Sequence, residues 1–540
     1  MNAITSLCLP QNEPVLNYAP NSRERKAVET EIKHLKAHFQ EIPMIIDGEK
    51  ITSSQTVSIS TPHDHQKELG KYHYAQDKDI NLAIASVLKA HPSWANTDMD
   101  TRAHIFLKAA DLLATKYRAK INAATMLGQS KNIYQAEIDA ACELIDFLRF
   151  NVYFMYQIYA QQPISSNSQR NIIDYRPLEG FVLAITPFNF TSIGGNLPTA
   201  PAIMGNTVIW KPSSTQILSA YVFMEVLMEA GLPRGVINLI YCDGPELSKI
   251  ALNHPSFAGL HFTGSTHTFQ NLWKNIGEHI SSYHSYPRIV GETGGKDFTI
   301  IHSSANPQVA AVSLIRGAFE YQGQKCSATS RAYISKSIWP EVWKYFEKYL
   351  KNISIGSPEN FKNFLNAVID RKAFDKITSY IERARSLKSN QIIYGGVYDD
   401  SIGYFITPTV ILTEDAQSIT MREEIFGPVL TIYLFEDSHF DEILNLVDST
   451  SPYALTGSVL ARDRAAISQA KQALRNAAGN FYINDKPTGA VVGQQPFGGA
   501  RKSGTNDKAG SYLNLLRWVS PRNIKENFNP PIDYTYDFMK

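Results

Sequence analysis

Short apolar segments alternate with helical segments through the middle of this chain, and this alternation limits the fold more than any other feature. The apolar segments are 181–185, 207–210, 236–241 and 259–262. Stretches with helical spacing lie between them, such as 219–230, which Gly231 and Pro233 end. Strands that alternate with helices in this way form parallel sheets covered on both faces. We therefore expect an α/β fold with a nucleotide-binding type of sheet.

A second alternation begins after Glu292. Residues 298–302 and 331–334 are strand-like, and 309–320 has helical spacing. A chain of 540 residues is too long for one ordinary core, so two α/β domains that meet near residue 292 are the simplest division. The tail 505–540 is too polar and too often interrupted by proline to form a domain. Further helices are expected at 23–39, 79–89, 101–116, 133–159 and 267–280.

Charge and cysteine content narrow the function classes. The 52 basic and 51 acidic residues nearly cancel, so a concentrated basic surface for nucleic acid is not expected. Cys8, Cys142, Cys242 and Cys326 are too far apart for a zinc site or a disulfide framework, which is typical of a reducing compartment. No stretch approaches the roughly 20 apolar residues of a membrane-spanning helix, and residues 1–10 lack a secretory pattern. We expect a soluble cytoplasmic protein without a membrane or nucleic-acid partner.

Cys326 differs from the other cysteines because small and polar residues, Gly323 to Ser327, surround it. A structural cysteine usually lies among apolar neighbours, whereas a reactive one needs an electropositive, partly open setting that favours the thiolate. Upstream, Glu292 places a carboxylate just before the glycine pair Gly294 and Gly295. We interpret Cys326 as a candidate nucleophile, and inert packing is the alternative.

Two polar segments follow predicted strands, where open α/β sheets bind ligands. Phe262, Thr263, Gly264, Ser265 and Thr266 lie between a strand and a helix, whose free N–H groups could receive a pyrophosphate. A plain helix cap by Ser265 or Thr266 is the alternative. Lys211 ends another strand and could hold ribose hydroxyls or a phosphate, or else be a solvated surface lysine.

Two further side chains could serve a carbonyl reaction. The amide of Asn189 could stabilise an oxyanion formed when a nucleophile adds to a carbonyl, although asparagine near proline is also common in turns. Glu424 could accept hydrogen bonds from ribose hydroxyls while Phe426 packs against a flat ring. A solvated loop carboxylate is the alternative for Glu424.

The order of these segments resembles the aldehyde dehydrogenase superfamily from about residue 40 to about residue 520. The matching stretches are 185–189, 211–212, 262–266, 292–296, 323–326, 424–428 and 496–499. The resemblance implies NAD(P)-dependent oxidation of an aldehyde to a carboxylate, through a thiohemiacetal and a thioester on Cys326. Glu292 would be the general base. The side chain of Asn189 and the backbone N–H of Cys326 would form the oxyanion hole.

The same resemblance implies a set of cofactor contacts and no metal. NAD is favoured over NADP, although Ser213 replaces a glutamate that many NAD-specific relatives carry, which leaves the preference open. The cofactor-binding residues that it implies are Thr186, Lys211, Ser213, Phe262, Thr263, Gly264, Ser265, Thr266, Gly294, Glu424 and Phe426.

Residues 488–508 resemble the L-glutamate γ-semialdehyde dehydrogenases, also called Δ1-pyrroline-5-carboxylate dehydrogenases. The resemblance implies oxidation of the semialdehyde to L-glutamate, the second step of proline degradation. In that family a loop grips the substrate α-carboxylate by backbone N–H groups, here those of Gly489 and Ala490, and some members carry serine at the Ala490 position. Ser327 would be a further donor. The other implied substrate contacts are Phe497, Phe190 and Glu137.

The resemblance also implies a domain plan and an assembly. A Rossmann-type NAD-binding domain would comprise 1–160 and 178–291, with about 40 N-terminal residues as an extension, and the catalytic domain would comprise 292–485. Segments 161–177 and 505–540 would form a β-hairpin oligomerisation arm and a C-terminal tail in a homodimer or larger homo-oligomer. Another semialdehyde dehydrogenase, such as one for succinic semialdehyde, and a non-catalytic protein on the same scaffold are the alternatives.

Overall fold

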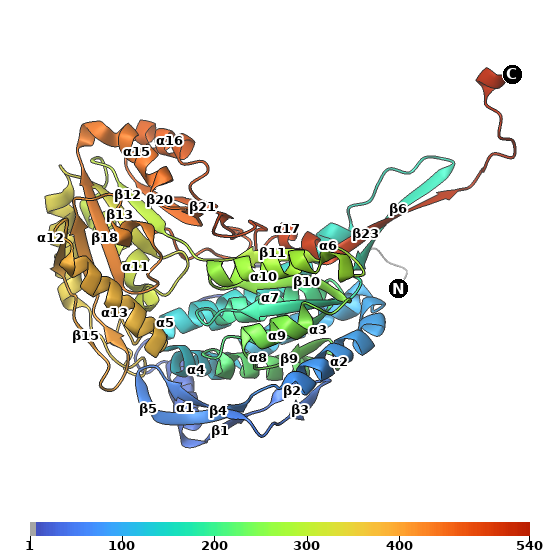
Figure 1. The fold of residues 1–540 in the computed structure, drawn as a ribbon, viewed down its shortest axis with the longest axis horizontal. Helices are drawn as coiled ribbons and strands as arrows, with labels where there is room; N and C mark the ends of the chain where they lie inside the picture. The colour runs from blue at the N-terminus through green and yellow to red at the C-terminus, as the bar shows by residue number, and fades with distance from the viewer. Residues whose placement is uncertain (1–6) are drawn as a thin grey trace.

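The computed structural model describes residues 7–540 and contains two α/β units, each built on a seven-stranded sheet (Figure 1). The first sheet has the order β11-β10-β7-β8-β9-β2-β3, parallel from β11 to β9 and antiparallel at β2 and β3. Its strands are β2 (Met44–Ile46), β3 (Glu49–Ile51), β7 (Phe181–Thr186), β8 (Thr207–Pro212), β9 (Ile237–Leu239), β10 (Phe257–Thr263) and β11 (Arg288–Glu292).

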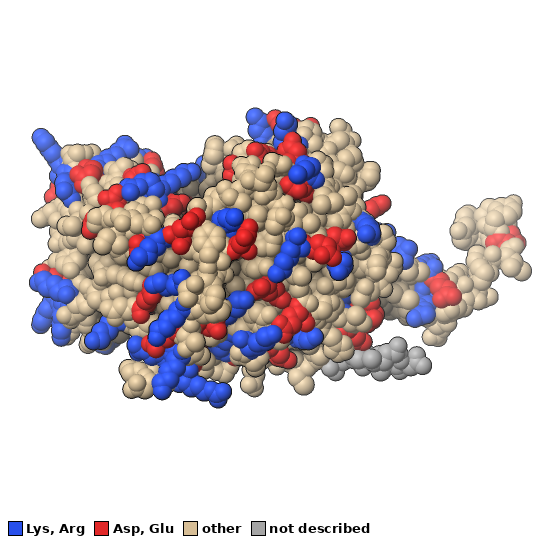
Figure 2. Space-filling view, turned by 90° about the horizontal axis from the view of Figure 1, so that it is seen from below, with Lys and Arg blue, Asp and Glu red and all other residues tan. Residues whose placement is uncertain are grey.

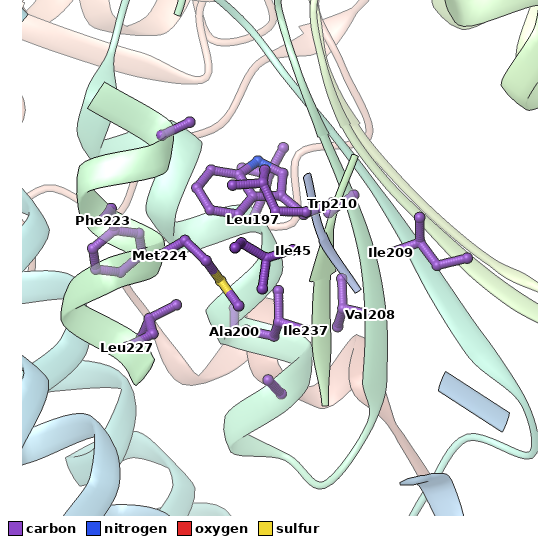
Figure 3. Close-up of a cluster of buried hydrophobic side chains, with 14 of the residues drawn as sticks. Ile45, Leu197, Ala200, Val208, Ile209, Trp210, Phe223, Met224, Leu227 and Ile237 are labelled. Atoms are coloured by element: carbon purple, nitrogen blue, oxygen red, sulfur yellow. The ribbon is translucent and has the colours of Figure 1, made fainter. Parts of the chain in front are cut away.

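The core of the first unit explains why its strands are continuous apolar runs. Every residue of β7 is buried, because helices cover the sheet. Val208 and Trp210 of β8 meet Phe223 and Leu227 of helix α8 (Ile217–Ala230) (Figure 3). The other helices of this unit are α2 (Asp77–Ala95), α3 (Met99–Ala114), α4 (Arg118–Gln129), α7 (Thr191–Ile203), α9 (Gly244–Ala251) and α10 (Thr266–Glu278).

The second unit repeats the pattern with the order β14-β17-β18-β13-β12-β20-β21, in which only the β14–β17 pair is antiparallel among the described strands. Its strands are β12 (Asp297–Ile301), β13 (Thr329–Ser335), β14 (Asn390–Tyr394), β17 (Thr409–Thr413), β18 (Val429–Phe435), β20 (Thr456–Leu460) and β21 (Asn480–Ile483). Its longer helices are α11 (Pro307–Phe319), α12 (Trp339–Asn352), α13 (Arg371–Ser386), α15 (Phe440–Ser449) and α16 (Arg464–Ala473). The expectation of an α/β fold is confirmed.

The expected long helix at 133–159 forms over that range but contains a π-helical segment. It comprises α5 (Ile133–Ala136), the π-helix η1 (Glu137–Glu143) and α6 (Leu144–Tyr159). A π-helical turn changes the direction in which the following side chains point, because it adds a residue to the turn. The π-helix begins at Glu137 and ends at Glu143, so these two carboxylates lie at its opposite ends. The apolar periodicity of the sequence does not show this difference.

Smaller elements surround the two units. Helix α1 (Arg23–Ala37) packs against helix α4 of the first unit. Next to α1 lies a three-stranded sheet of order β1-β5-β4, formed by β1 (Gln40–Ile42), β4 (Thr56–Thr61) and β5 (Asp64–His73). The short elements are α14 (Ile419–Arg422), β15 (Tyr398–Asp399), β16 (Phe405–Ile406), β19 (Tyr453–Ala454), β22 (Ala500–Arg501) and α17 (Tyr512–Leu515). Acidic and basic side chains are interspersed over the face shown in Figure 2.

A two-stranded ribbon projects from the first unit, and the chain continues beyond it to the C-terminus (Figure 1). It pairs β6 (Gln169–Pro177) with β23 (Val519–Asn527) in antiparallel register. Just before β23, Leu515 and Trp518 are fully buried in the core of the first unit, so this stretch of the C-terminal tail packs against that unit. No helix among the described residues is long and apolar enough to cross a membrane.

Candidate active site between the two sheets

The expected site residues gather where the carboxyl ends of the first sheet meet the amino ends of the second. Strands β7, β8, β10 and β11 end at Thr186, Pro212, Thr263 and Glu292. Strands β12, β13 and β18 begin shortly after Gly295, Cys326 and Phe426. Open α/β sheets bind ligands beyond the carboxyl ends of their strands. The junction of the two units therefore brings the two halves of the expected site together.

The segment before Cys326 has an unusual backbone. Tyr321, Gln322 and Gly323 follow one another in the left-handed region, with φ of 50°, 55° and 65°. Such conformations are unfavourable for residues with a side chain and persist where the surrounding structure holds them. The amide of Gln322 is held by the carbonyls of Ser130 and Ala367, and it accepts a hydrogen bond from the Asn366 amide.

Gly323 brings the Cys326 segment against the loop that carries Glu424 and Phe426. A Cβ atom at position 323 would lie 2.2 Å from the carbonyl oxygen of Gly427, so only glycine fits there. Phe426 also has a left-handed backbone, with φ of 63°. One pocket is lined by Cys326, Glu424 and Phe426 together, so the expected nucleophile and the expected ribose-binding carboxylate share one space.

Asn189 lies beside the chain that leads into Cys326. Its Nδ2 donates a hydrogen bond to the carbonyl of Gln324 at 3.1 Å, and its side chain is buried. The Gln324 side chain in turn accepts a hydrogen bond from the Ile369 amide. The amide of Asn189 is therefore fixed next to the nucleophile segment, with a second N–H that donates to no described residue.

The electrostatic setting of Cys326 differs from the electropositive one expected for a reactive cysteine. Burial raises the pKa of the Cys326 thiol well above its ordinary value, and the carboxyl groups of Asp297, Glu292 and Glu424 raise it further. Burial and these carboxyl groups therefore disfavour the thiolate, so activation of Cys326 requires a group that accepts the thiol proton. The positive charge beside it, Lys325, is paired with Glu320 at 3.1 Å.

Glu292 has the properties of a group that can accept a proton. It ends β11, and its Oε2 accepts a hydrogen bond from the Gly499 amide at 3.0 Å. Burial raises the pKa of Glu292 well above its ordinary value, although the Gly499 hydrogen bond and the Lys508 ammonium oppose the shift. A raised pKa makes a carboxylate a stronger base near neutral pH. Lys508 is held by the carbonyls of Gly479 and Gly498, on the chain that carries Gly499.

Two of the expected ribose-binding residues, Lys211 and Glu424, keep hydrogen-bonding groups that no described residue uses. Lys211, at the end of β8, donates to no described residue, and burial lowers the pKa of its ammonium group. Glu424 accepts a hydrogen bond from the Gly295 amide through Oε1 at 2.9 Å, which leaves Oε2 able to accept others. Gly294 permits this approach, because a Cβ there would lie 2.3 Å from Glu424 Oε2. A free cation and a free carboxylate oxygen are suitable partners for sugar hydroxyls.

The other expected cofactor residues differ in how free they are. Ser265 caps α10 by accepting a hydrogen bond from the Thr268 amide, so the cap alternative is correct for Ser265. Phe262 is buried against Phe269. The hydroxyl of Thr186 accepts from the Trp210 indole and donates to Gln216, whereas that of Ser213 meets Thr215. The Gly264 amide donates to the Glu292 carbonyl, and Thr263 and Thr266 flank this turn.

The expected substrate loop presents free backbone donors. Gly489 has φ of +93°, and the N–H groups of Gly489 and Ala490 donate to no described residue. The preceding hydroxyl, of Thr488, lies 2.8 Å from that of Ser327, next to the nucleophile. Successive free N–H groups can bind an anion. Phe497 is half-buried nearby and pairs with Ala509.

Phe190 is positioned by a buried ion pair. Lys131 Nζ lies 4.2 Å from the centre of the Phe190 ring and 2.7 Å from Asp139 Oδ2. Asp139 also accepts hydrogen bonds from the amides of Thr191 and Ser192, the first residues of α7. The ring is therefore fixed directly after Asn189 by contacts that include a cation–π interaction.

The structure does not bring Glu137 to the substrate loop. Its side chain is fully buried, and its oxygens accept hydrogen bonds from Arg118, Asn122, the Tyr18 hydroxyl and the Leu16 amide. A carboxylate with all its acceptor positions used inside the protein is not available to a substrate. We therefore correct the expectation and assign Glu137 a structural role.

Two charged residues of this region were not identified from the sequence. Glu143, at the other end of the π-helix, accepts a hydrogen bond from Ser192 at 2.9 Å, and burial together with Asp139 raises the pKa of its carboxyl group to about 8. Lys486 lies beside the substrate loop, since a Cβ on Gly489 would be 3.4 Å from its Nζ. The sequence offered one signal for Lys486, since it lies three residues before the glycine turn at Gly489. Glu143 could not be identified without the π-helix that places it next to Ser192.

Known proteins resemble this chain over most of its length. Residues 50–520 match the family model described as the aldehyde dehydrogenase family. A mitochondrial delta-1-pyrroline-5-carboxylate dehydrogenase of Dictyostelium discoideum is 50% identical over 533 residues, which cover 98% of this chain and 96% of that protein. The mitochondrial human enzyme of the same name is 47% identical over 537 residues, or 99% and 95% of the two chains. A crystal structure of the enzyme from Mycobacterium tuberculosis bound with NAD matches with a TM-score of 0.97 and 54% identity over 100% of both chains.

Proposed function

The chain belongs to the aldehyde dehydrogenase family, and from this premise we propose that it oxidises L-glutamate γ-semialdehyde to L-glutamate with NAD, the second step of proline degradation. The semialdehyde forms by ring opening of Δ1-pyrroline-5-carboxylate. One observation carries the proposal: the free backbone N–H groups of Gly489 and Ala490 lie on a loop that is tied by Thr488 to Ser327, next to Cys326. An anion held there lies close to the nucleophile.

We propose that Lys211 and Glu424 hold the two riboses of NAD and that the turn from Phe262 to Thr266 lies beside its pyrophosphate. The free ammonium of Lys211 and the free Oε2 of Glu424 support this assignment. When bound, NAD supplies the acceptor for the hydride that the substrate carbon loses.

The chain's own groups carry the remaining chemistry. The Cys326 thiol gives its proton to water, and its sulfur forms a bond to the aldehyde carbon, so that the carbon–oxygen double bond opens and the carbonyl oxygen becomes an oxyanion. Asn189 and the Cys326 amide stabilise that oxyanion. Its collapse expels hydride and leaves a thioester on Cys326. Glu292 then takes a proton from water, the hydroxyl adds to the thioester carbon, and the carbon–sulfur bond breaks to release L-glutamate.

The decisive experiment measures NADH formation from Δ1-pyrroline-5-carboxylate. Cys326→Ala is the matched control, because it removes the nucleophile and little volume. We expect turnover by the wild type, little with succinic semialdehyde, which is one carbon shorter and lacks the α-amino group, and none with Cys326→Ala. Equal or faster turnover of simple alkyl aldehydes would contradict the substrate assignment. Full activity of Cys326→Ala would contradict the mechanism.

We also propose the domain plan and assembly that the family resemblance implies. The NAD-binding domain would comprise 1–160 and 178–291, the catalytic domain 292–485, and the arm and tail 161–177 and 505–540. The ribbon of β6 and β23 and the tail after it support a homodimer or larger assembly, because apolar tail residues are exposed: Phe528, Ile532, Tyr534, Phe538 and Met539. Light scattering that shows monomers at micromolar concentration would contradict it.

We propose a cytoplasmic location, which four unpaired cysteines at Cys8, Cys142, Cys242 and Cys326 support. The Dictyostelium and human relatives are named mitochondrial enzymes, so a mitochondrial location is the outcome that would overturn this proposal. Cell fractionation followed by detection of the protein distinguishes the two.

A further inference from the structure

The N-terminal segment, residues 7–22, reaches the substrate loop from the opposite end of the chain. Asn12 makes the contact. Its Nδ2 donates hydrogen bonds to the Val492 carbonyl and to Asp146 Oδ2, each at 2.8 Å. Its Oδ1 accepts a hydrogen bond from Gln494 Nε2, also at 2.8 Å. One half-buried side chain therefore ties the loop to helix α6, which carries Asp146.

The segment that presents Asn12 is itself firmly attached. The next residue, Glu13, lies between Arg118 and Arg149, and its backbone amide donates to Asp146 Oδ1 at 2.8 Å. Further along, the Leu16 amide and the Tyr18 hydroxyl donate to the buried carboxylate of Glu137. The segment that carries Asn12 is therefore anchored to helix α4, the π-helix and α6.

The loop beyond Gly489 and Ala490 depends on this support and on packing. Val492 is buried against Phe147 and Phe150 of α6. The following residue, Gly493, has φ of +79°, and a Cβ there would lie 2.3 Å from Phe150. On the other side of the two donors, Thr488 is tied to Ser327. Gly489 and Ala490 thus lie between two anchored residues. One is Thr488, which contacts Ser327, and the other is Val492, which Asn12 and the α6 aromatic rings hold.

We propose that Asn12 is a positioning residue for the substrate carboxylate: by fixing Val492 and Gln494 it sets the direction of the Gly489 and Ala490 N–H groups. The inference rests on the proposed function, because it takes the semialdehyde carboxylate as the ligand of this loop. It gives the N-terminal extension a role in substrate selection. Backbone donors bind an anion well only when their direction is fixed before the ligand arrives.

The first test compares steady-state kinetics of Asn12→Ala with the wild type. We expect the KM for Δ1-pyrroline-5-carboxylate to rise about tenfold, equivalent to about 1.4 kcal/mol of binding, with kcat within about twofold. The KM for butanal, which has no carboxylate, stays unchanged. Gln11→Ala is the matched control, since it removes an exposed amide from the adjacent position. An equal rise in KM for both aldehydes, or none for either, would overturn the inference.

A second substitution separates hydrogen bonding from shape. Asn12→Asp keeps the volume but replaces the donor with a carboxylate that faces the Val492 carbonyl and Asp146. We therefore expect Asn12→Asp to raise the KM for the semialdehyde more than Asn12→Ala does. If Asn12→Asp behaves as the wild type, Asn12 only fills space and the inference fails.

Hydrogen exchange tests the same inference without turnover. The amides of Gln494 and Gln495 donate to the Val491 carbonyl, and the Val491 amide donates to the Gln495 side chain. We expect the peptide containing residues 488–495 to exchange faster in Asn12→Ala than in the wild type or Gln11→Ala. If the wild type does not oxidise the semialdehyde, the proposed function fails, and exchange alone decides whether Asn12 orders the loop. Unchanged exchange would overturn that ordering.

Discussion

Replacement of Glu137 by glutamine separates a structural role from a substrate-binding role. The carboxylate is fully buried and accepts hydrogen bonds from five groups of the chain, including the Arg118 guanidinium and the Leu16 amide. Glutamine keeps the shape, but it removes the charge and turns one acceptor into a donor that faces other donors. We expect Glu137→Gln to unfold more readily while the KM for Δ1-pyrroline-5-carboxylate stays unchanged.

The magnitude follows from the buried ion pair. Removal of one partner from such a pair costs about 3–5 kcal/mol, because the other charge is left buried. Arg118 keeps Glu13 as a second partner, so we expect the lower end, about 3 kcal/mol, or a roughly 150-fold larger unfolding equilibrium constant.

The pH dependence of this difference has a defined sign. Burial alone would raise the pKa of Glu137, but hydrogen bonds from Arg118 and the Leu16 amide outweigh it and lower the pKa. The stabilisation is therefore complete above the unfolded pKa of about 4.3, and it is lost as the pH falls through the lower folded value. Below about pH 4 the difference between wild type and Glu137→Gln is expected to shrink.

Urea unfolding followed by tryptophan fluorescence measures the effect. Glu29→Gln is the matched control, because Glu29 pairs with Arg25 on the surface with its side chain 41% exposed, and its loss is expected to cost less than about 1 kcal/mol. The KM is measured on the same preparations at neutral pH. A Glu137→Gln protein as stable as the wild type, but with a raised KM, would refute the structural role.

Three further substitutions test the site. Lys508→Met is expected to raise the pKa of Glu292, because the Lys508 ammonium lowers that pKa. The rise of kcat with pH is therefore expected to move to higher pH. An unchanged pH profile of kcat would argue against this coupling. Glu292→Gln is expected to lower kcat by about 10²–10⁴-fold while a burst of one NADH per active site remains, and loss of the burst would place Glu292 in the first step as well. Gly493→Ala is expected to raise the KM for the semialdehyde, since its Cβ would lie 2.3 Å from Phe150 in a left-handed backbone. Phe150→Leu should partly restore the KM of Gly493→Ala, and no restoration would assign the defect to the backbone alone.

The sheets were predictable because their strands are buried on both faces. The run 181–185 contains only apolar residues, and the structure buries all of β7. Strand β9 was less well bounded, at Ile237–Leu239 instead of 236–241, because apolar periodicity does not show where pairing ends. The order of motifs identified the family, since several weak matches in register are specific.

Other features depend on tertiary contacts that no local pattern contains. The π-helix separates Glu137 from Glu143, and only the structure shows that the first is enclosed by Arg118. The raised pKa of the Cys326 thiol arises from burial and from carboxylates distant in the sequence. Asn12 could not be connected with Val492, because nothing in the two segments indicates that they meet.

The burial of Leu515 and Trp518 has a consequence for how the molecule is made. A ribosome completes the whole second sheet before it supplies the last side chains that fill the first. The core of the first unit therefore stays incomplete while some two hundred further residues are synthesised. A recombinant fragment that stops at residue 291 would lack Leu515 and Trp518 and therefore part of its core. Co-expression with a peptide that spans 505–527 is expected to restore these core contacts.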